Sequence, residues 1–141
     1  MIPRKLLKNS LSLDPLTNKI SGEIVDAAYK VHFVLGPGLL ESVYEKCLLH
    51  KISQKGLKVE QQVSLPIDFE GIRLDAGLRL DLLVEKRVIV ELKAVETLLP
   101  IHEAQLLTQL KLSGMKLGLL INFNVPILKK GIKRIAYSKT K

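Results

Sequence analysis

Apolar and polar positions divide the first third of the chain into two helical stretches. From about Asn18, apolar residues recur at helical spacing as far as Leu35, which predicts a first helix. Gly36-Pro37-Gly38 interrupts this pattern, and a second helix is expected from there to about Gln54. Gly56 follows directly and is typical of a helix C-terminus. The chain therefore opens on a pair of helices.

After this pair the apolar period becomes two, which is typical of strands. Pro66 weakens the end of the first strand, and Glu70-Gly71 has the composition of a hairpin turn. Further strands are expected over residues 72–84, 88–94, 117–123 and 129–137, with a loop over 85–87 and a helix over 102–114. The order is ααβββαβ with an additional edge strand at the end, so periodicity alone favours an α/β or α+β fold.

Composition is that of one globular domain. The chain has 141 residues, of which 47% are hydrophobic and 26% charged. We expect a basic, poorly ordered lead over residues 1–16, one domain over 17–137 and a basic tail over 138–141. The single cysteine, Cys47, excludes a disulfide within the chain and a multi-cysteine zinc site, and it fits a cytoplasmic protein.

Charge gives the first indication of a partner. Lys and Arg number 22 and Asp and Glu 14, so the formal net charge is +8. This balance favours a polyanion, either nucleic acid or an anionic membrane surface. No apolar run approaches the about 18 residues of a membrane-spanning helix. Residues 1–9 make a poor amphipathic anchor because they are few and contain Pro3, so we expect nucleic acid and no membrane.

Two acidic residues are expected to face each other on neighbouring strands. In the segment 88–94, Glu91 and Lys93 share one face, whereas Val88, Val90, Leu92 and Ala94 make the other face apolar. In the preceding strand, Leu74, Ala76, Leu78, Leu80, Leu82 and Val84 are expected on one face and Asp81 on the other. The apolar faces align only if residues 85–87 form a three-residue loop, and this register places Asp81 opposite Glu91.

Two facing carboxylates repel each other and need a positive partner. Mg²⁺ is one candidate, because it takes oxygen ligands, commonly one or two carboxylates with waters and substrate phosphates. The Leu92 carbonyl is a candidate for a further ligand, and Lys93 could assist a water or stabilise charge on phosphorus. The alternative is a structural network of Asp, Lys and Glu on a solvated sheet face.

Two helices carry further candidates. Glu41 falls in the first turn of the second helix, where an acidic residue is also favourable for the helix itself. His102, Gln105 and Gln109 share one stripe of the 102–114 helix, which either holds water or phosphate or is an ordinary solvated face. His102 is expected to be a cap or surface residue rather than a metal ligand.

The C-terminal segment is basic and free of acidic residues. It either contacts phosphates or acts as a solubilising tail, and its cations in the last expected strand are Lys129, Lys130, Lys133 and Arg134. Because one chain offers one site, cutting both strands of a duplex favours a homodimer. We expect its interface on the first helix, at Ile24, Val31 and Val34.

These residues together resemble a known family. Gly38-x-x-Glu41-x-x-Tyr44, the segments 79–84 and 90–96, His102-Glu103-Ala104-Gln105-Leu106-Leu107 and Leu119–Phe123 resemble the GxxExxY proteins of the PD-(D/E)XK nuclease-like superfamily. The resemblance runs from about residue 17 to 135. It implies a restriction-endonuclease-like core, in which a mixed sheet is flanked by helices.

The resemblance also implies a site and an activity. Carried over residue by residue, the metal site would comprise Glu41, Asp81, Glu91 and Lys93, with Gln105 as an accessory. The implied activity is Mg²⁺- or Mn²⁺-dependent hydrolysis of phosphodiester bonds in DNA. The alternative is a catalytically silent module that binds nucleic acid or a protein. The family commonly has Tyr at the positions of Leu78 and Gln109, which are candidates for the substrate groove.

Overall fold

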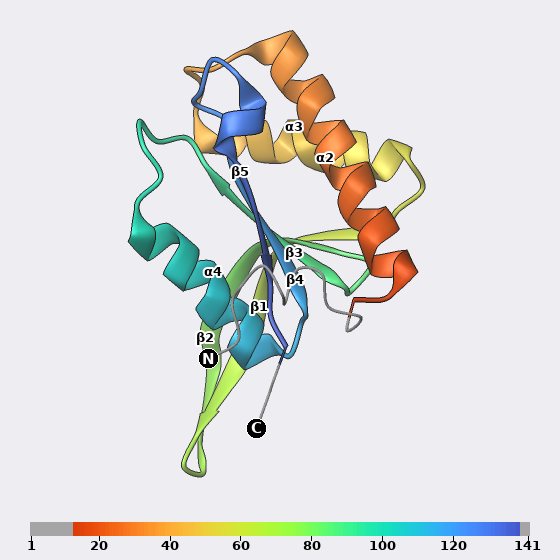
Figure 1. Ribbon diagram of the computed structural model, residues 1–141. Coiled ribbons are helices and arrows are strands. Elements are labelled where there is room, and N and C mark those ends of the chain that lie inside the picture. Colours follow the sequence, from red (N-terminus) through yellow and green to blue (C-terminus); the bar gives the residue numbers. More distant parts are fainter. Residues whose placement is uncertain (1–12, 139–141) are drawn as a thin grey trace.

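A five-stranded mixed sheet carries two helices on one face and one on the other (Figure 1). The computed structural model describes residues 13–138, so the expected amphipathic segment 1–9 and the end of the basic tail lie outside it. The elements in chain order are α2 (Pro15–Leu35), α3 (Glu41–Gln54), β1 (Val59–Phe69), β2 (Ile72–Val84), β3 (Val88–Lys93), α4 (Pro100–Ser113), β4 (Leu117–Asn122), a 3₁₀ turn (Leu128–Gly131) and β5 (Ile132–Ala136).

Helix α2 begins earlier than its apolar period predicts. Asp14 is the N-cap, because its carboxylate accepts the Thr17 N–H at 2.7 Å. Pro15 stands in the first turn, where its missing N–H costs nothing. The folded part of the chain therefore starts before residue 17, and Leu13 is already buried in the core.

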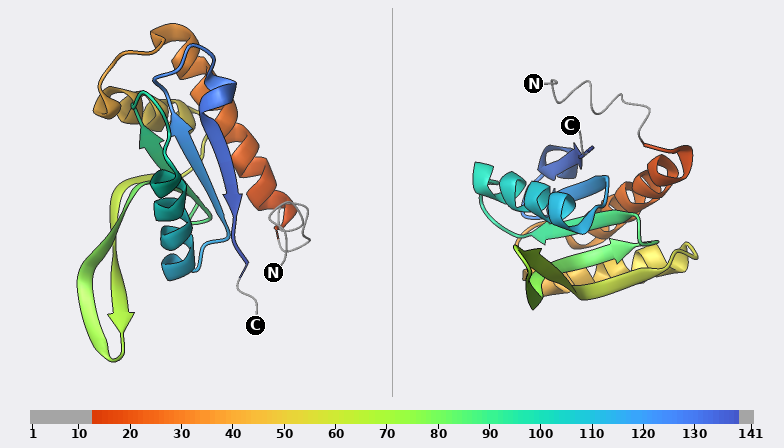
Figure 2. Two further views of the ribbon diagram at one scale, coloured as in Figure 1. Left: turned by 60° about the vertical axis from the view of Figure 1, so that its left-hand side comes forward. Right: turned by 90° about the horizontal axis from the view of Figure 1, so that it is seen from below.

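The sheet order β1-β2-β3-β4-β5 follows the chain. Strands β1 and β2 form a long antiparallel hairpin whose turn, Glu70-Gly71, has positive φ at both residues, as predicted for this pair. Its distal part extends beyond the helices (Figure 2). Pro66 lies within β1 rather than at its end, which is tolerated because β1 is an edge strand.

Strands β3 and β4 are parallel, and α4 makes the crossover between them. Strand β5 then pairs antiparallel with β4 and forms the second edge. It is shorter than expected, because Lys129 and Lys130 belong to the preceding 3₁₀ turn. No helix within residues 13–138 is long and apolar enough to cross a membrane.

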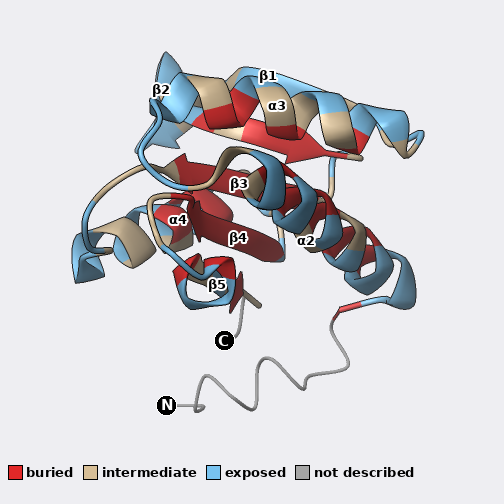
Figure 3. Ribbon diagram, turned by 90° about the horizontal axis from the view of Figure 1, so that it is seen from above, coloured by how far each residue is buried: buried red, intermediate tan, exposed pale blue. Residues whose placement is uncertain are grey.

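The core consists of two apolar clusters separated by the sheet (Figure 3). The larger cluster joins α2 and α3 to one sheet face, and the smaller one joins α4 to the other. Ile24 and Val31 are buried in the larger cluster, so their expected role in a dimer interface is wrong. Only Val34 of the three residues is exposed, since it lies in the last turn of α2.

Candidate metal centre

The predicted register between β2 and β3 is confirmed. Val84 pairs with Val88 and Leu82 with Val90, so that the next pair along the strands is Asp81 and Glu91. At this point side chains replace the backbone ladder. The Asp81 N–H donates to Glu91 Oε1 at 3.2 Å, and the Leu92 N–H donates to Asp81 Oδ2 at 2.9 Å. The two carboxylates are therefore held between strands that separate beyond Leu82.

Strand β2 changes face at Asp81, which corrects the simple alternation expected for its leucines. Leu82 packs in the α2–α3 cluster, whereas Leu80 packs in the α4 cluster. The opposing strand is irregular at the same place, since Gln62 has φ +52° between the pairs Gln61–Leu82 and Val63–Leu80. A non-glycine residue rarely adopts this conformation. The irregularity directs Leu80 to α4 without interrupting the hairpin.

Burial and proximity disfavour negative charge on the pair. Desolvation and the Asp81 carboxylate raise the pKa of Glu91 from 4.5 to about 7. Its side chain is only 9% exposed. Desolvation likewise raises the pKa of Asp81, although the Leu92 N–H opposes this rise. Near neutral pH Glu91 is therefore partly protonated, and a cation at this point would favour its ionised form.

Glu41 is brought to the same place by the start of α3. Partial desolvation and the neighbouring Asp81 charge raise the pKa of Glu41, and the Lys93 ammonium and the Ala94 N–H oppose this rise. Glu41 itself is exposed to solvent, and its carboxylate lies beside the end of β3. The structure brings together Glu41, Asp81, Glu91 and Lys93.

Tyr44 fixes the loop before Glu41. Its hydroxyl donates to the Gly36 carbonyl at 2.6 Å and accepts the Leu39 N–H at 3.1 Å. Its ring stacks on Phe123 with centroids 4.7 Å apart. Gly38 has φ +100° within this loop, a conformation that favours glycine. These contacts determine where α3 begins, and therefore where Glu41 lies.

A further carboxylate, Glu45, was missed by the sequence analysis. It lies one turn after Glu41 and is buried, with its oxygens accepting from the side-chain amides of Gln61 and Gln62 at 2.9 to 3.1 Å. Its charge adds to the forces that raise the pKa of Asp81. The i, i+4 spacing from Glu41 was the available signal, but the amide partners come from β1 and are distant in sequence.

Asn122 fixes the chain just after Lys93. Its side chain is buried and bonds both polar groups of Val95, accepting from the N–H at 3.0 Å and donating to the carbonyl at 2.9 Å. The Phe123 N–H also donates to the Lys93 carbonyl at 3.0 Å. The end of β3 is thus tied to the end of β4, which positions Lys93 beside the carboxylates.

Helix α4 brings Gln109 rather than Gln105 against the carboxylates. The Gln109 side chain lies beside Glu91, where its interaction with the carboxylate lowers the pKa of Glu91 and opposes the effect of burial. Gln105 lies one turn away and is exposed. His102 accepts the Leu99 N–H through Nδ1 at 3.0 Å, so its expected role as a cap is confirmed. Leu78 and Gln109, the two departures from the resembled family, line one pocket.

The four basic candidates of the C-terminal segment are dispersed. Lys133 faces α4, where it pairs with Glu103 at 3.6 Å, whereas Arg134 faces α2 and bonds Asn18. Neighbouring residues of a strand point to opposite faces, which explains this division. Lys129 and Lys130 are exposed on the 3₁₀ turn. None of the four belongs to β2 or β3, the strands that carry the acidic pair.

The carboxylate oxygens suit a hard divalent cation that takes its remaining ligands from water and from the phosphates of a substrate. Within residues 13–138, no three Asp, Glu, His or Cys side chains are arranged so that they alone could hold a metal ion. Asp81 and Glu91 each direct one oxygen to a backbone N–H, which leaves a second oxygen on each outside those bonds. One or two carboxylates are sufficient for Mg²⁺ when waters and phosphates supply the other ligands.

Comparison with known proteins agrees with this geometry. The family model of the PD-(D/E)XK nuclease superfamily matches residues 18–135. The match covers most of the chain, which therefore belongs to the PD-(D/E)XK nuclease superfamily, and the α/β fold with a mixed sheet is consistent with its restriction-endonuclease-like core. Members of this superfamily typically use divalent metals. No curated protein and no solved structure matched the chain.

The raised pKa of Glu91 predicts that its ionisation destabilises the fold. The pKa of Glu91 is raised from its ordinary value of 4.5, which applies to the unfolded chain, to about 7 in the folded protein. Between these two pH values the folded state therefore binds more protons than the unfolded state. The contribution of Glu91 to stability is therefore lost as pH rises through 7. Relative to Glu91→Gln, the wild type should lose about 2 kcal/mol of unfolding free energy between about pH 5 and about pH 8.

Urea unfolding at both pH values, without divalent cations, measures this difference. Glu60→Gln is the matched control, because Glu60 is an exposed carboxylate on β1 whose ammonium partner is Lys86. A constant difference between wild type and Glu91→Gln across this range would contradict the assigned ionisation.

Proposed function

We propose that the protein is a Mg²⁺- or Mn²⁺-dependent nuclease that hydrolyses phosphodiester bonds in DNA. The observation that carries this proposal is the convergence of Glu41, Asp81 and Glu91, from three different elements, beside Lys93. Of the three, Glu91 is buried, Asp81 is partly buried and Glu41 is exposed. A buried carboxylate beside other carboxylates is costly unless it is compensated, so such a group is typical of a functional site that binds a cation. Membership of the nuclease superfamily supports the same reaction class.

Each residue has a proposed role. Asp81 and Glu91, with the Leu92 carbonyl, would hold the cation, and Glu41 would orient it or a water beside it. When bound, the cation would supply Lewis-acid stabilisation of the phosphate and activation of water. The Lys93 ammonium would stabilise negative charge on the phosphate and assist the attacking water. Gln105 would position water or phosphate from the exposed side of α4.

A catalytically silent module is the second candidate. The observation that favours it is the lack, within residues 13–138, of three ligating side chains already arranged around one point. Such a module would bind nucleic acid or a protein without cleaving it. Metal affinity distinguishes the candidates, because a silent module needs no cation at the carboxylates.

Calorimetric titration with Mn²⁺ tests the metal centre directly. We expect saturable binding to the wild type and its loss in Asp81→Asn and in Glu91→Gln, since each variant removes a ligand charge. At about pH 6, binding should release close to one proton, because the metal-free pKa of Glu91 is about 7. Titrations in two buffers of different ionisation enthalpy measure this release.

Asp75→Asn provides the control, because Asp75 is a highly exposed carboxylate on the hairpin and should not alter Mn²⁺ binding. If wild type and both site variants bind Mn²⁺ equally, with or without DNA, the proposed centre is wrong. Saturable binding with cleavage of DNA would exclude the silent module.

We propose that exposed cations of the C-terminal segment contact the DNA backbone. Lys129 and Lys130 are the best placed of these cations, since Lys133 and Arg134 also make contacts within the fold. Replacement of Lys129 and Lys130 by Ala should reduce the slope of log affinity against log salt by about two. Fluorescence anisotropy with duplex DNA at several salt concentrations measures this slope.

Lys86→Ala is the matched control for these cations. Lys86 is also exposed, but it lies on the β2–β3 loop, where it pairs with Glu60 at 3.3 Å. Equal slopes for the wild type and the Lys129/Lys130 variant would contradict the proposed contact.

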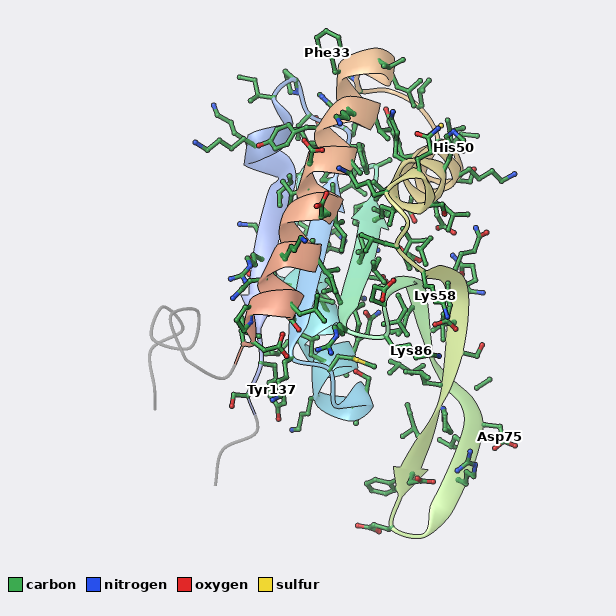
Figure 4. The ribbon with its side chains drawn as sticks, turned by 90° about the vertical axis from the view of Figure 1, so that its right-hand side faces the viewer. Phe33, His50, Lys58, Asp75, Lys86 and Tyr137 are labelled. Atoms are coloured by element: carbon green, nitrogen blue, oxygen red, sulfur yellow. The ribbon has the colours of Figure 1, made fainter. Side chains whose placement is uncertain are left out.

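We also propose a homodimer, with its interface at the C-terminal end of α2. Phe33 is 90% exposed there and projects from the body of the molecule (Figure 4), next to exposed Val34. Both residues line an open groove of about 660 Å³ that also includes Ile127. An exposed apolar patch of this kind is typical of an interaction surface.

Light scattering at micromolar concentration should give the mass of a dimer for the wild type and of a monomer for Phe33→Asp. Phe69→Asp is the control, because Phe69 is an exposed aromatic residue at the opposite end of the molecule, near the hairpin turn. A monomeric wild type would contradict the dimer.

We also propose that, within the superfamily, the chain is a GxxExxY protein. It is supported by distinct roles for the three residues of that motif: Gly38 allows the loop, Glu41 contributes its carboxylate, and Tyr44 fixes both.

A further inference from the structure

A pocket of about 270 Å³ lies between β2 and α4, next to the candidate metal centre. Gln109 connects the two, because it lines the pocket and its side chain also lies beside Glu91. Leu78 forms part of the opposite wall and precedes Asp81 by three residues of the same strand, a distance of about 10 Å. The pocket is lined by Leu78, Ile101, Ala104, Gln105, Thr108 and Gln109.

Gln109 is unusual among the buried polar residues of this fold. Its side chain is 7% exposed, and its Oε1 atom is buried without a hydrogen-bond partner in the described part of the chain. A buried acceptor without a donor is rare and needs an explanation. A ligand that enters the pocket and donates a hydrogen bond would provide one, after a rotation of the terminal amide.

The chemistry of the walls restricts what that ligand could be. Leu78, Ile101 and Ala104 present aliphatic surface, whereas Gln105, Thr108 and Gln109 present hydrogen-bonding groups on one helix. A group that fits both has apolar faces and a polar edge. Nucleobases have this combination, and their edges carry amide-like donors and acceptors.

We propose that this pocket holds one unpaired nucleobase of the strand whose phosphate lies at the metal centre. This inference rests on the proposed nuclease function and specifies its substrate class. A paired base within a duplex cannot enter the pocket unless it is flipped out of the stack, which costs free energy. The protein should therefore favour single-stranded, mismatched or otherwise unpaired DNA over an intact duplex.

Binding of two short single-stranded oligonucleotides tests the pocket. The strands have equal length and charge, and one lacks bases at its central positions, so the phosphate contribution is the same for both. Anisotropy is measured in EDTA, which prevents cleavage. The wild type should bind the base-bearing strand roughly tenfold more tightly than the abasic strand.

Filling the pocket should remove this preference. Ala104→Phe places a ring in the pocket from an exposed position of α4, and Ala104→Ser is the control that keeps the pocket open. The phenylalanine variant should bind both strands equally, whereas the serine variant should behave as the wild type. Thr108→Phe, also at an exposed position, fills the pocket independently and should repeat the result.

The outcomes separate this proposal from the metal centre. Equal affinity of the wild type for both strands would overturn the nucleobase pocket, whatever its Mn²⁺ binding. An unchanged preference in both Ala104→Phe and Thr108→Phe would overturn it as well. A preference that the filled variants lose, in a protein that binds no Mn²⁺, would support the pocket and refute the nuclease.

Discussion

The hydrogen bonds between Asp81 and the end of β3 determine how this sheet is built. Where the regular ladder would continue, each carboxylate instead accepts a backbone N–H from the strand that carries the other carboxylate. This arrangement separates β2 from β3 and allows β2 to change face, so that Leu80 packs under α4 while Leu82 packs under α3. Asp81 and Glu91 thus lie where β2 changes from one core cluster to the other.

Residues distant in sequence hold this arrangement in place. Tyr44 fixes the start of α3 against Gly36, and Asn122 fixes the chain after β3. The two contacts are also close to each other, because the Tyr44 ring stacks on Phe123, the residue that follows Asn122. Buried side chains with satisfied hydrogen bonds therefore position Glu41 and Lys93, whereas the carboxylates themselves repel each other. The stability of the site comes from its surroundings and not from its own charges.

Much of the centre could be predicted because it depends on local rules. The three-residue loop after Val84 set the register, and alternation along β3 placed Glu91 with Lys93. The rest depended on contacts that periodicity does not encode. The change of face at Asp81 requires positive φ at Gln62, and the position of Glu45 requires amides from β1. Tertiary packing determines how α4 is rotated about its axis, and this rotation places Gln109 beside Glu91 and leaves Gln105 exposed.

The net charge of the chain and the local charge of the acidic centre have opposite signs. The chain has a net charge of +8, yet the carboxylates of Glu41, Glu45, Asp81 and Glu91 lie close to one another. The pKa of Glu91, about 7, reduces this negative charge near neutral pH. In the proposed function, cations elsewhere on the surface would attract DNA over longer distances. In that function, attraction of DNA and binding of the cation would belong to different parts of the surface, so that affinity for DNA and affinity for metal could be changed independently.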